Sequence, residues 1–193
     1  MPPKYKFTKQ EIIQAALDIT RTEGIHSVTA RAVGAKLNSS SKVIFGLFQN
    51  MEKLQEEVIK AAHDLYQNYL KEDMLKGKYP PYKASGMAYI RFAKEEKELF
   101  KLLFMRDRSE EKIEQNLDEI KPLLQIIQKN IGLSEQDAYM FHIEMWLYVH
   151  GIATMIATSY LEWDGETISN VLTDGYMGLK ERYSRKDEKN GCD

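Results

Sequence analysis

Residues 27–54, SVTARAVGAKLNSSSKVIFGLFQNMEKL, constrain the fold more than any other stretch, because they predict two very short helices followed by the start of a long one. Thr29 is placed to cap the first short helix, and Val28 and Val33 can form a hydrophobic staple around that cap. The polar run over residues 38–41 competes for backbone hydrogen bonds, so it should end this helix, and one of its side chains can cap the next.

The second short helix is expected over residues 41–47. Two short helices joined by a turn of a few residues have the geometry of a helix-turn-helix, whose second helix enters the major groove of DNA while the first crosses the backbone. Helical hairpins that bind no nucleic acid share this pattern, so the stretch alone leaves both interpretations open.

The sequence before this stretch predicts one more helix. Thr8 and Glu11 form a capping box, and Phe7 and Ile12 form a staple around it. Apolar residues then recur with helical spacing until Gly24, which suits a helix end. The three helices should share a small core made of Ile12, Ala16, Ile19, Val28, Val33, Leu37, Ile44 and Phe48.

The rest of the chain is also predicted to be helical, because it contains no run of alternating apolar residues and no hairpin turn signal. Asn50 can cap a long helix that ends before Gly77. Further helices are expected over residues 82–104 in two segments meeting near 95–96, over 109–131 with Pro122 breaking or kinking it, from Ser134 to near Trp163, and over 166–183, before a polar tail that frays. The predicted fold class is all-α.

Charge is distributed unevenly along the chain. Residues 1–50 carry seven Lys or Arg and three Asp or Glu, a net charge of +4, whereas the remainder has a net charge of −6. Such asymmetry suggests that the basic part faces a polyanion. The only cysteine, Cys192, cannot form an intrachain disulfide, no signal peptide is evident, and the apolar stretch 140–161 is interrupted by Glu144 and two histidines. We therefore expect a cytoplasmic protein without a membrane span.

Motifs at both ends of the chain resemble one protein family. The first motif consists of Thr29, Ala32, Val33, the serine-rich turn, Ile44, Phe45, Phe48, Glu52 and Leu54, which resembles the signature of TetR-like transcriptional regulators. The second, AYIRFAKEEKELFKLLF together with the run Trp146 to Gly151, resembles the C-terminal domain of the TetR subgroup named for its Trp-His-Gly motif. The resemblance implies a helix-turn-helix DNA-binding domain over residues 1–50 and a helical effector-binding and dimerisation domain over residues 51–193.

The implied function is that of a ligand-responsive regulator, a repressor that binds palindromic operator DNA as a homodimer. Its partners would be double-stranded DNA, a second copy of the chain through the last two helices, and an unidentified small-molecule effector. The candidate DNA-binding residues are Thr29, Arg31, Lys36, Ser40, Ser41, Lys42, Val43, Phe45 and Gly46. Lys42 suits a guanine edge or a phosphate, and Val43 suits a thymine methyl group.

Three residues depart from the usual signature at positions near DNA. Phe45 replaces a tyrosine and loses a hydroxyl donor, Met51 replaces a lysine and loses a charge, and Lys42 replaces a glycine. Each lost phosphate contact should weaken binding to all DNA sequences alike.

The candidate effector site lies among aromatic residues of the second domain, although such residues at helical spacing also suit a plain core. It consists of Tyr66, Tyr89, Phe92, Phe100, Phe104, Trp146 and His150. No cysteine or carboxylate completes a metal set with the histidines, so we expect no metal and no cofactor.

Two other classes of function remain as alternatives. One is an all-α interaction or small-molecule-binding protein that has lost DNA binding, which the substitutions at Phe45 and Met51 would allow. The other is an all-α enzyme using His150 with Glu144 or Tyr148, but no nucleophile, phosphate loop or metal motif supports it. We therefore expect no catalytic residues.

Overall fold

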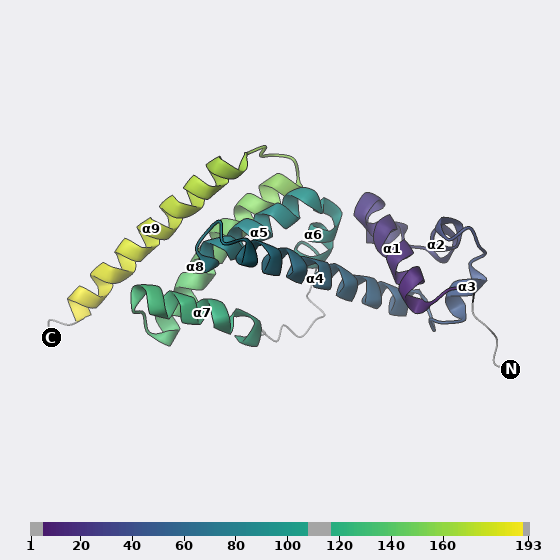
Figure 1. Ribbon diagram of the computed structural model, residues 1–193, viewed down its shortest axis with the longest axis horizontal. Helices are drawn as coiled ribbons and strands as arrows, with labels where there is room; N and C mark the ends of the chain where they lie inside the picture. The colour runs from purple at the N-terminus through teal and green to yellow at the C-terminus, as the bar shows by residue number, and fades with distance from the viewer. Residues whose placement is uncertain (1–5, 108–116, 191–193) are drawn as a thin grey trace. The chain divides into compact units, whose positions relative to one another are not determined.

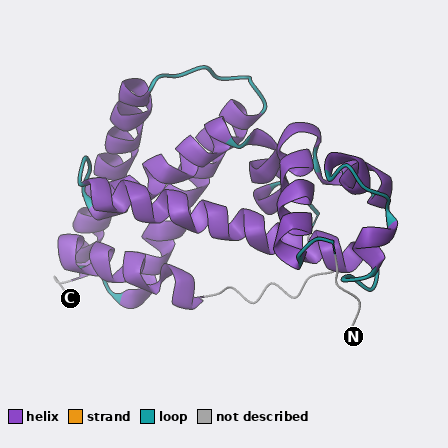
Figure 2. Cartoon of the chain, turned by 45° about the vertical axis from the view of Figure 1, so that its right-hand side comes forward, coloured by secondary structure: helices purple, strands orange, loops and turns teal. Residues whose placement is uncertain are grey.

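The computed structural model describes residues 6–107 and 117–190, and every regular element within those two ranges is a helix (Figures 1 and 2). The predicted all-α fold class is confirmed. Over the same residues, no helix combines the length and the apolar character needed to cross a membrane.

The chain packs into two compact units. The head unit is Met1–Asn68 with Glu95–Asp107, and the body unit is Tyr69–Lys94 with Arg108–Asp193. The long helix α4 (Met51–Lys76) contributes residues to both units. These units are defined by packing, whereas the predicted division after residue 50 concerns function and stays a prediction.

The head unit begins with α1 (Lys9–Glu23), and its predicted capping box is confirmed. The Thr8 hydroxyl accepts from the Glu11 amide at 3.2 Å, while the Glu11 carboxylate accepts from the Thr8 amide at 2.7 Å. These hydrogen bonds hold the pKa of the Glu11 carboxyl below its usual value. The helix ends at Gly24, which has a φ of +81° and donates its amide to the Thr20 carbonyl. A single 3-10 turn, η1 (Ile25–Ser27), leads into the next helix.

The two short helices are α2 (Ala30–Lys36) and α3 (Lys42–Phe45). The predicted cap of α2 is confirmed, because the Thr29 hydroxyl accepts from the Ala32 amide at 3.1 Å. The predicted side-chain cap of α3 is wrong. Ser41 occupies the cap position with helical backbone angles, so its hydroxyl makes no capping hydrogen bond there. Helix α3 is therefore a single turn, shorter than predicted.

The predicted small core is almost entirely buried. Of its members only Leu37 is partly exposed, because it follows the last residue of α2. Asn50 caps α4 as predicted, accepting from the Lys53 amide at 2.9 Å. Helix α6 (Lys97–Phe104) packs against α1 in the same unit and buries Leu99 and Phe100 completely.

The body unit contains α5 (Pro81–Glu95), α7 (Leu117–Ile131), α8 (Glu135–Ala157) and α9 (Gly165–Asn190). The predicted break between α5 and α6 at residues 95–96 is confirmed. Pro122 does not break α7, which continues through it. The predicted start of that helix at residue 109 lies outside the described residues. Helices α7, α8 and α9 share a core of Leu124, Ile127, Leu133, Ala138, Phe141, Met145 and Tyr183.

Two predicted helix ends are wrong. Helix α8 ends at Ala157 rather than near Trp163, because Ser159 adopts a φ of +59° and the Tyr160 amide donates back to the Met155 carbonyl at 2.8 Å. Helix α9 continues past Tyr183 to Asn190. Residues 184–190 contain no glycine or proline, and an i,i+4 ion pair between Arg185 and Glu181 supports the added turns.

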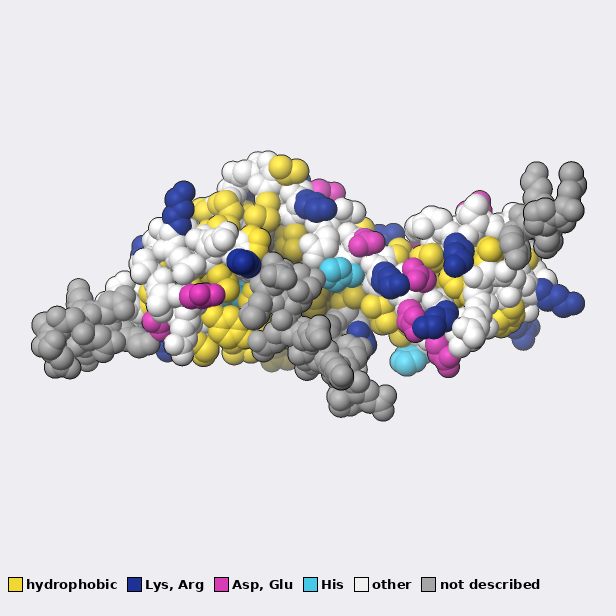
Figure 3. Space-filling view, turned by 90° about the horizontal axis from the view of Figure 1, so that it is seen from below, with side chains coloured by type: hydrophobic (Ala, Val, Ile, Leu, Met, Phe, Trp, Pro, Cys, Tyr) yellow, Lys and Arg dark blue, Asp and Glu magenta, His cyan; other side chains and the backbone are white. Residues whose placement is uncertain are grey.

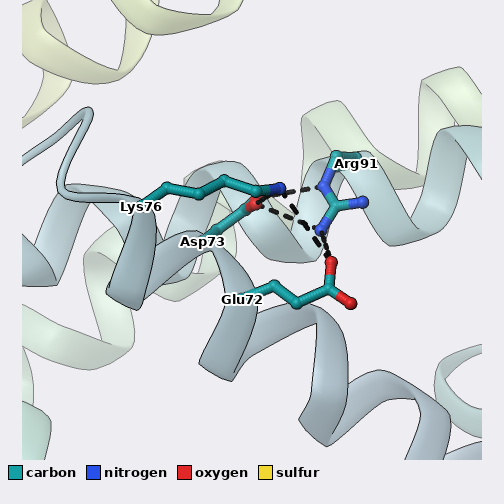
Figure 4. Close-up of polar contacts among 4 residues, drawn as sticks. All are labelled: Glu72, Asp73, Lys76 and Arg91. Carbon is teal, nitrogen blue, oxygen red and sulfur yellow. Dashed lines mark hydrogen bonds and ion pairs between the residues drawn. The ribbon is translucent and has the colours of Figure 1, made fainter.

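Within the body unit, the end of α4 is fixed to α5 by a charged cluster (Figure 4). Arg91 donates to both oxygens of Asp73, at 3.0 and 3.1 Å, and to Glu72 at 3.3 Å. Lys76 donates to Asp73 at 2.9 Å. Burial of the Asp73 carboxyl disfavours its charge, but the hydrogen bonds from Lys76 and Arg91 outweigh burial and lower its pKa. The Arg91 guanidinium also lies 4.1 Å from the centre of the Tyr69 ring.

Candidate nucleic-acid interface

The exposed side of α2 and α3 carries most of the predicted DNA-binding residues. Thr29, Arg31 and Lys36 are exposed on or beside α2, and Ser40, Lys42, Phe45 and Gly46 are exposed on or beside α3, while Ser41 and Val43 are partly buried. Figure 3 shows Lys and Arg side chains, interspersed with acidic ones, on the surface of the head unit at the right of the view. Their role in binding stays a prediction.

The inward side of the same helices matches the prediction for Ile44 and Phe48. Ile44 is fully buried and Phe48 is 5% exposed, whereas the neighbouring Phe45 is 53% exposed. An aromatic ring of that size costs free energy in water unless a partner covers it. Phe45 therefore presents its ring to the solvent on the same side as Lys42 and Gly46, and its contact with DNA stays a prediction.

Gly34 is a structural determinant of the turn that sequence reasoning missed. A Cβ atom at this position would lie 2.9 Å from the Ser41 amide nitrogen, 3.0 Å from the Ser40 carbonyl carbon and 3.1 Å from the Ser39 oxygen. The Ser39 amide also donates to the Gly34 carbonyl at 2.8 Å. The turn therefore packs directly on the α2 backbone. A glycine inside a short predicted helix was the available signal, since it is unfavourable there without such a reason.

Lys9 is a second residue that the sequence did not single out. Its ammonium group lies 5.6 Å from the centre of the Phe48 ring, which connects the first turn of α1 with the segment after α3. Lys9 lies far from residues 29–46 in sequence, so only the packing reveals this contact.

The predicted effector residues fall into two aromatic groups, one in each unit. In the head unit, Tyr66 packs edge-on against Phe104, and Phe104 contacts Phe100, with ring centres 5.2 Å apart in both pairs. Tyr66 and Phe104 are partly buried, whereas Phe100 is fully buried.

The other four predicted effector residues belong to the body unit. The Tyr89 hydroxyl lies 2.8 Å from His150 Nδ1, and Trp146 stacks on the His150 ring with ring centres 4.9 Å apart. Burial lowers the pKa of His150, so the neutral imidazole is favoured. Phe92 is fully buried and packs edge-on against Tyr69. Among the described residues, no three His, Cys, Asp or Glu side chains gather as a metal site would require.

Helices α8 and α9 carry a group of exposed apolar side chains. On α8 they recur at positions 140, 147, 148 and 155, which share one helical face, and Met177 lies on α9. We refer to Met140, Leu147, Tyr148, Met155 and Met177 as the α8–α9 apolar face. The exposed glycines 151 and 178 have open space where a Cβ would lie, whereas Ala153 and Ala157 are buried in the body unit.

Comparison with known proteins gives a match to a family model and matches to solved structures. Residues 82–174 match the family model of the tetracyclin repressor-like C-terminal domain. The fold is similar to the crystal structure of a TetR-like transcriptional regulator from Rhodococcus sp. RHA1, with a TM-score of 0.63 and 15% sequence identity over 92% of this chain and 95% of that chain. No curated protein sequence matches the chain significantly. Residues 82–174 therefore resemble a tetracyclin repressor-like C-terminal domain, and the structural match shows a shared fold.

Proposed function

We propose that the chain is a ligand-responsive transcriptional repressor that binds palindromic operator DNA as a homodimer in the cytoplasm. The observation that carries this proposal is the head unit itself. It combines a glycine-tightened turn between two short helices with an exposed, partly basic outer side, in a chain whose residues 82–174 match a TetR-type C-terminal domain.

In this proposal α3 enters the major groove and α2 braces it against the backbone. Lys42 is the principal base contact, and Val43 and Phe45 provide apolar contacts. Arg31 and Lys36 bind phosphates. The DNA backbone passes close to Thr29, Ser40, Ser41 and Gly46.

Dimerisation supplies the specificity that one small reading helix lacks. The α8–α9 apolar face is the proposed seam, because monomeric proteins rarely leave such a group of large side chains in water. Two heads related by a twofold axis would address half-sites about one DNA turn, or roughly 34 Å, apart, or at a wider spacing.

The proposed effector binds among the aromatic residues predicted above, in the manner of the Trp-His-Gly subgroup. To move the regulator from mostly DNA-bound to mostly released, the effector needs about 5.5 kcal/mol of preference for one state. The two aromatic groups are consistent with this proposal but equally with core packing.

A selection of duplexes from a random-sequence pool tests the DNA-binding proposal. The purified chain should enrich an inverted repeat, and fluorescence anisotropy should then show binding that weakens steeply as salt rises. Absence of enrichment, and no retention on duplex DNA even in dilute buffer, would instead favour the helical interaction protein to which Phe45 and Met51 point.

Two substitutions locate the interface. Lys42→Ala should change the selected sequence, because it removes a base contact, whereas Arg31→Ala should weaken all duplexes alike and reduce the salt slope by about one unit. If neither variant changes affinity for the selected duplex, the interface lies elsewhere.

A further inference from the structure

An ion pair joins the last turn of α1 to the start of α6, two segments that lie 75 positions apart in the sequence. The Arg21 Nε donates to one Glu96 carboxylate oxygen at 2.8 Å, and a terminal guanidinium nitrogen donates to the other. The Glu96 side chain is only 8% exposed, while that of Arg21 is 39% exposed. A two-point bond of this kind fixes both distance and orientation.

Glu96 occupies the joint between two helices. Helix α5 ends at Glu95 and α6 begins at Lys97, so Glu96 is the single non-helical residue between them, with φ −123° and ψ 54°. Its carbonyl accepts the first hydrogen bond of α6, from the Phe100 amide at 2.8 Å. It is also the second residue after the chain leaves the body unit at Lys94 and enters the head unit.

The helices joined by this pair fit closely at a second point. At Gly24, where α1 ends, a Cβ atom would lie 3.3 Å from the Glu98 carboxylate in the first turn of α6. Helix α1 in turn packs against α2, and α2 packs against α3. A change in the angle between α1 and α6 would therefore move the two short helices.

The energetics of such a pair favour a geometric role. Desolvation of a largely buried carboxylate offsets much of its attraction to the guanidinium, so an apolar pair of similar size often gives equal stability. What an apolar pair lacks is directionality, because hydrophobic contact tolerates sliding and rotation.

We propose that Arg21 and Glu96 are positioning residues that couple DNA binding by α2 and α3 to the docking of α6 on α1. The proposal rests on the DNA-binding function proposed above. The chain enters α6 directly from the body unit, so the pair lies close to one of the points where the chain passes between the two units. Coupling of this kind is reciprocal, so DNA bound to the head must also stabilise α6 in its docked position.

Hydrogen exchange of the full chain, with and without the duplex selected by the wild-type protein, tests the coupling. In the wild type, saturating duplex should slow exchange of the α6 amides as well as those of α1 to α3. In Arg21→Gln, the affinity for the same duplex should fall about tenfold, within the usual range of coupling between sites, and the protection of α6 by DNA should disappear.

A double variant, Arg21→Met with Glu96→Leu, separates positioning from stability. It leaves no unpaired buried charge, so its melting temperature should stay close to that of the wild type. It should nevertheless lose the DNA-dependent protection of α6. The charge-swapped double variant, Arg21→Glu with Glu96→Arg, should recover part of that protection.

The matched control is Arg185→Gln, which removes an exposed Arg–Glu pair within α9 and should leave both readouts unchanged. The proposal is overturned if the apolar double variant binds the duplex as tightly as the wild type and still shows protection of α6. A wild-type protein that selects no duplex at all would refute the DNA-binding function itself, which is a different outcome.

Discussion

At the scale of single residues, Gly34 decides whether the turn can close on α2. Gly34 follows Val33 inside α2, and the backbone of the turn lies in the space that a methyl group at this position would need. Contacts of 2.9 to 3.1 Å to backbone atoms cannot relax by rotation of a side chain. The head of this protein is therefore built around a closer approach than alanine permits.

Gly34→Ala should lower the stability of the head by about 1–3 kcal/mol, the usual cost of overpacking. It should also weaken DNA binding, because the turn must move away from α2 and carry α3 with it. Thermal unfolding and anisotropy measure the two effects. Gly165→Ala is the matched control, since open space surrounds that position at the start of α9 and no loss is expected there. Wild-type stability in Gly34→Ala would contradict the close packing.

Met51 offers a gain-of-function test at the same scale. It is the first residue of α4 and is partly exposed, where the family signature places a lysine. Met51→Lys should tighten binding to all duplexes and steepen the salt slope by about 0.9, the value for one added phosphate contact. A positive charge at a helix start is unfavourable, so Met51→Lys should lower the free energy of unfolding by about 0.3–1 kcal/mol at most. Salt titrations of both proteins should separate these effects, and equal slopes would place Met51 away from the phosphates.

At the scale of elements, the charged cluster on α5 determines how firmly the end of α4 is held in the body unit. Asp73 is bonded by two cations and is only 15% exposed at its side chain. Arg91→Ala should cost about 1–3 kcal/mol, because it leaves a poorly solvated carboxylate with a single cationic partner. Lys60→Ala, which removes an exposed pair within α4, should leave stability unchanged, because water screens that pair. The urea unfolding midpoints of the two variants should be compared with that of the wild type. If both variants lose the same stability, the cluster does not anchor α4.

The elements themselves were largely predictable from sequence, and the exceptions have physical reasons. Capping residues such as Thr8, Thr29 and Asn50 act over three or four positions, so local pattern reasoning finds them. The end of α8 depends on the positive φ of Ser159, which opposes an apolar sequence that favours continuation of the helix.

The contacts that organise the site were not predictable in the same way. Arg21 and Glu96 lie 75 positions apart, and nothing in their local sequence distinguishes this pair from ordinary surface charges. The local sequence likewise does not indicate that the Lys9 ammonium group lies over the Phe48 ring. A single sequence shows which residues face inward, but it does not show which distant partners they meet.

At the scale of the whole molecule, two histidines make stability depend on pH. The Tyr82 hydroxyl lies 3.2 Å from His142 Nδ1, and His142 is 8% exposed. Burial lowers the pKa of His142, as it does for His150. The unfolded chain therefore binds more protons than the folded chain below about pH 6.5, the ordinary value for histidine, and the folded state loses stability as pH falls from there.

His142→Gln should reduce this pH dependence, because the amide can still pair with Tyr82 but does not titrate. Urea unfolding at pH 7.5 and pH 5.5 should show a smaller difference in the free energy of unfolding for the variant than for the wild type. His26→Gln is the control, since His26 is exposed to water in the folded chain. An unchanged difference in His142→Gln would show that the pKa of His142 is the same in the folded and unfolded chains.

The last property of the whole molecule is its assembly, which the α8–α9 apolar face controls in our proposal. Leu147 is 58% exposed on this face, and a charge there would have to be desolvated when two copies meet. Leu147→Asp should convert the dimer to monomers in sedimentation equilibrium at micromolar concentration, without lowering the helix content. Leu75→Asp is a stringent control, because Leu75 is even more exposed, at 86%, but lies at the end of α4 away from this face in the sequence.

The Leu147→Asp monomer should keep weak, salt-sensitive binding through one head and lose most of its preference for inverted repeats, because linking two heads raises the effective concentration of the second. A Leu147→Asp protein that remains dimeric and still selects the repeat would require the seam to lie on another surface.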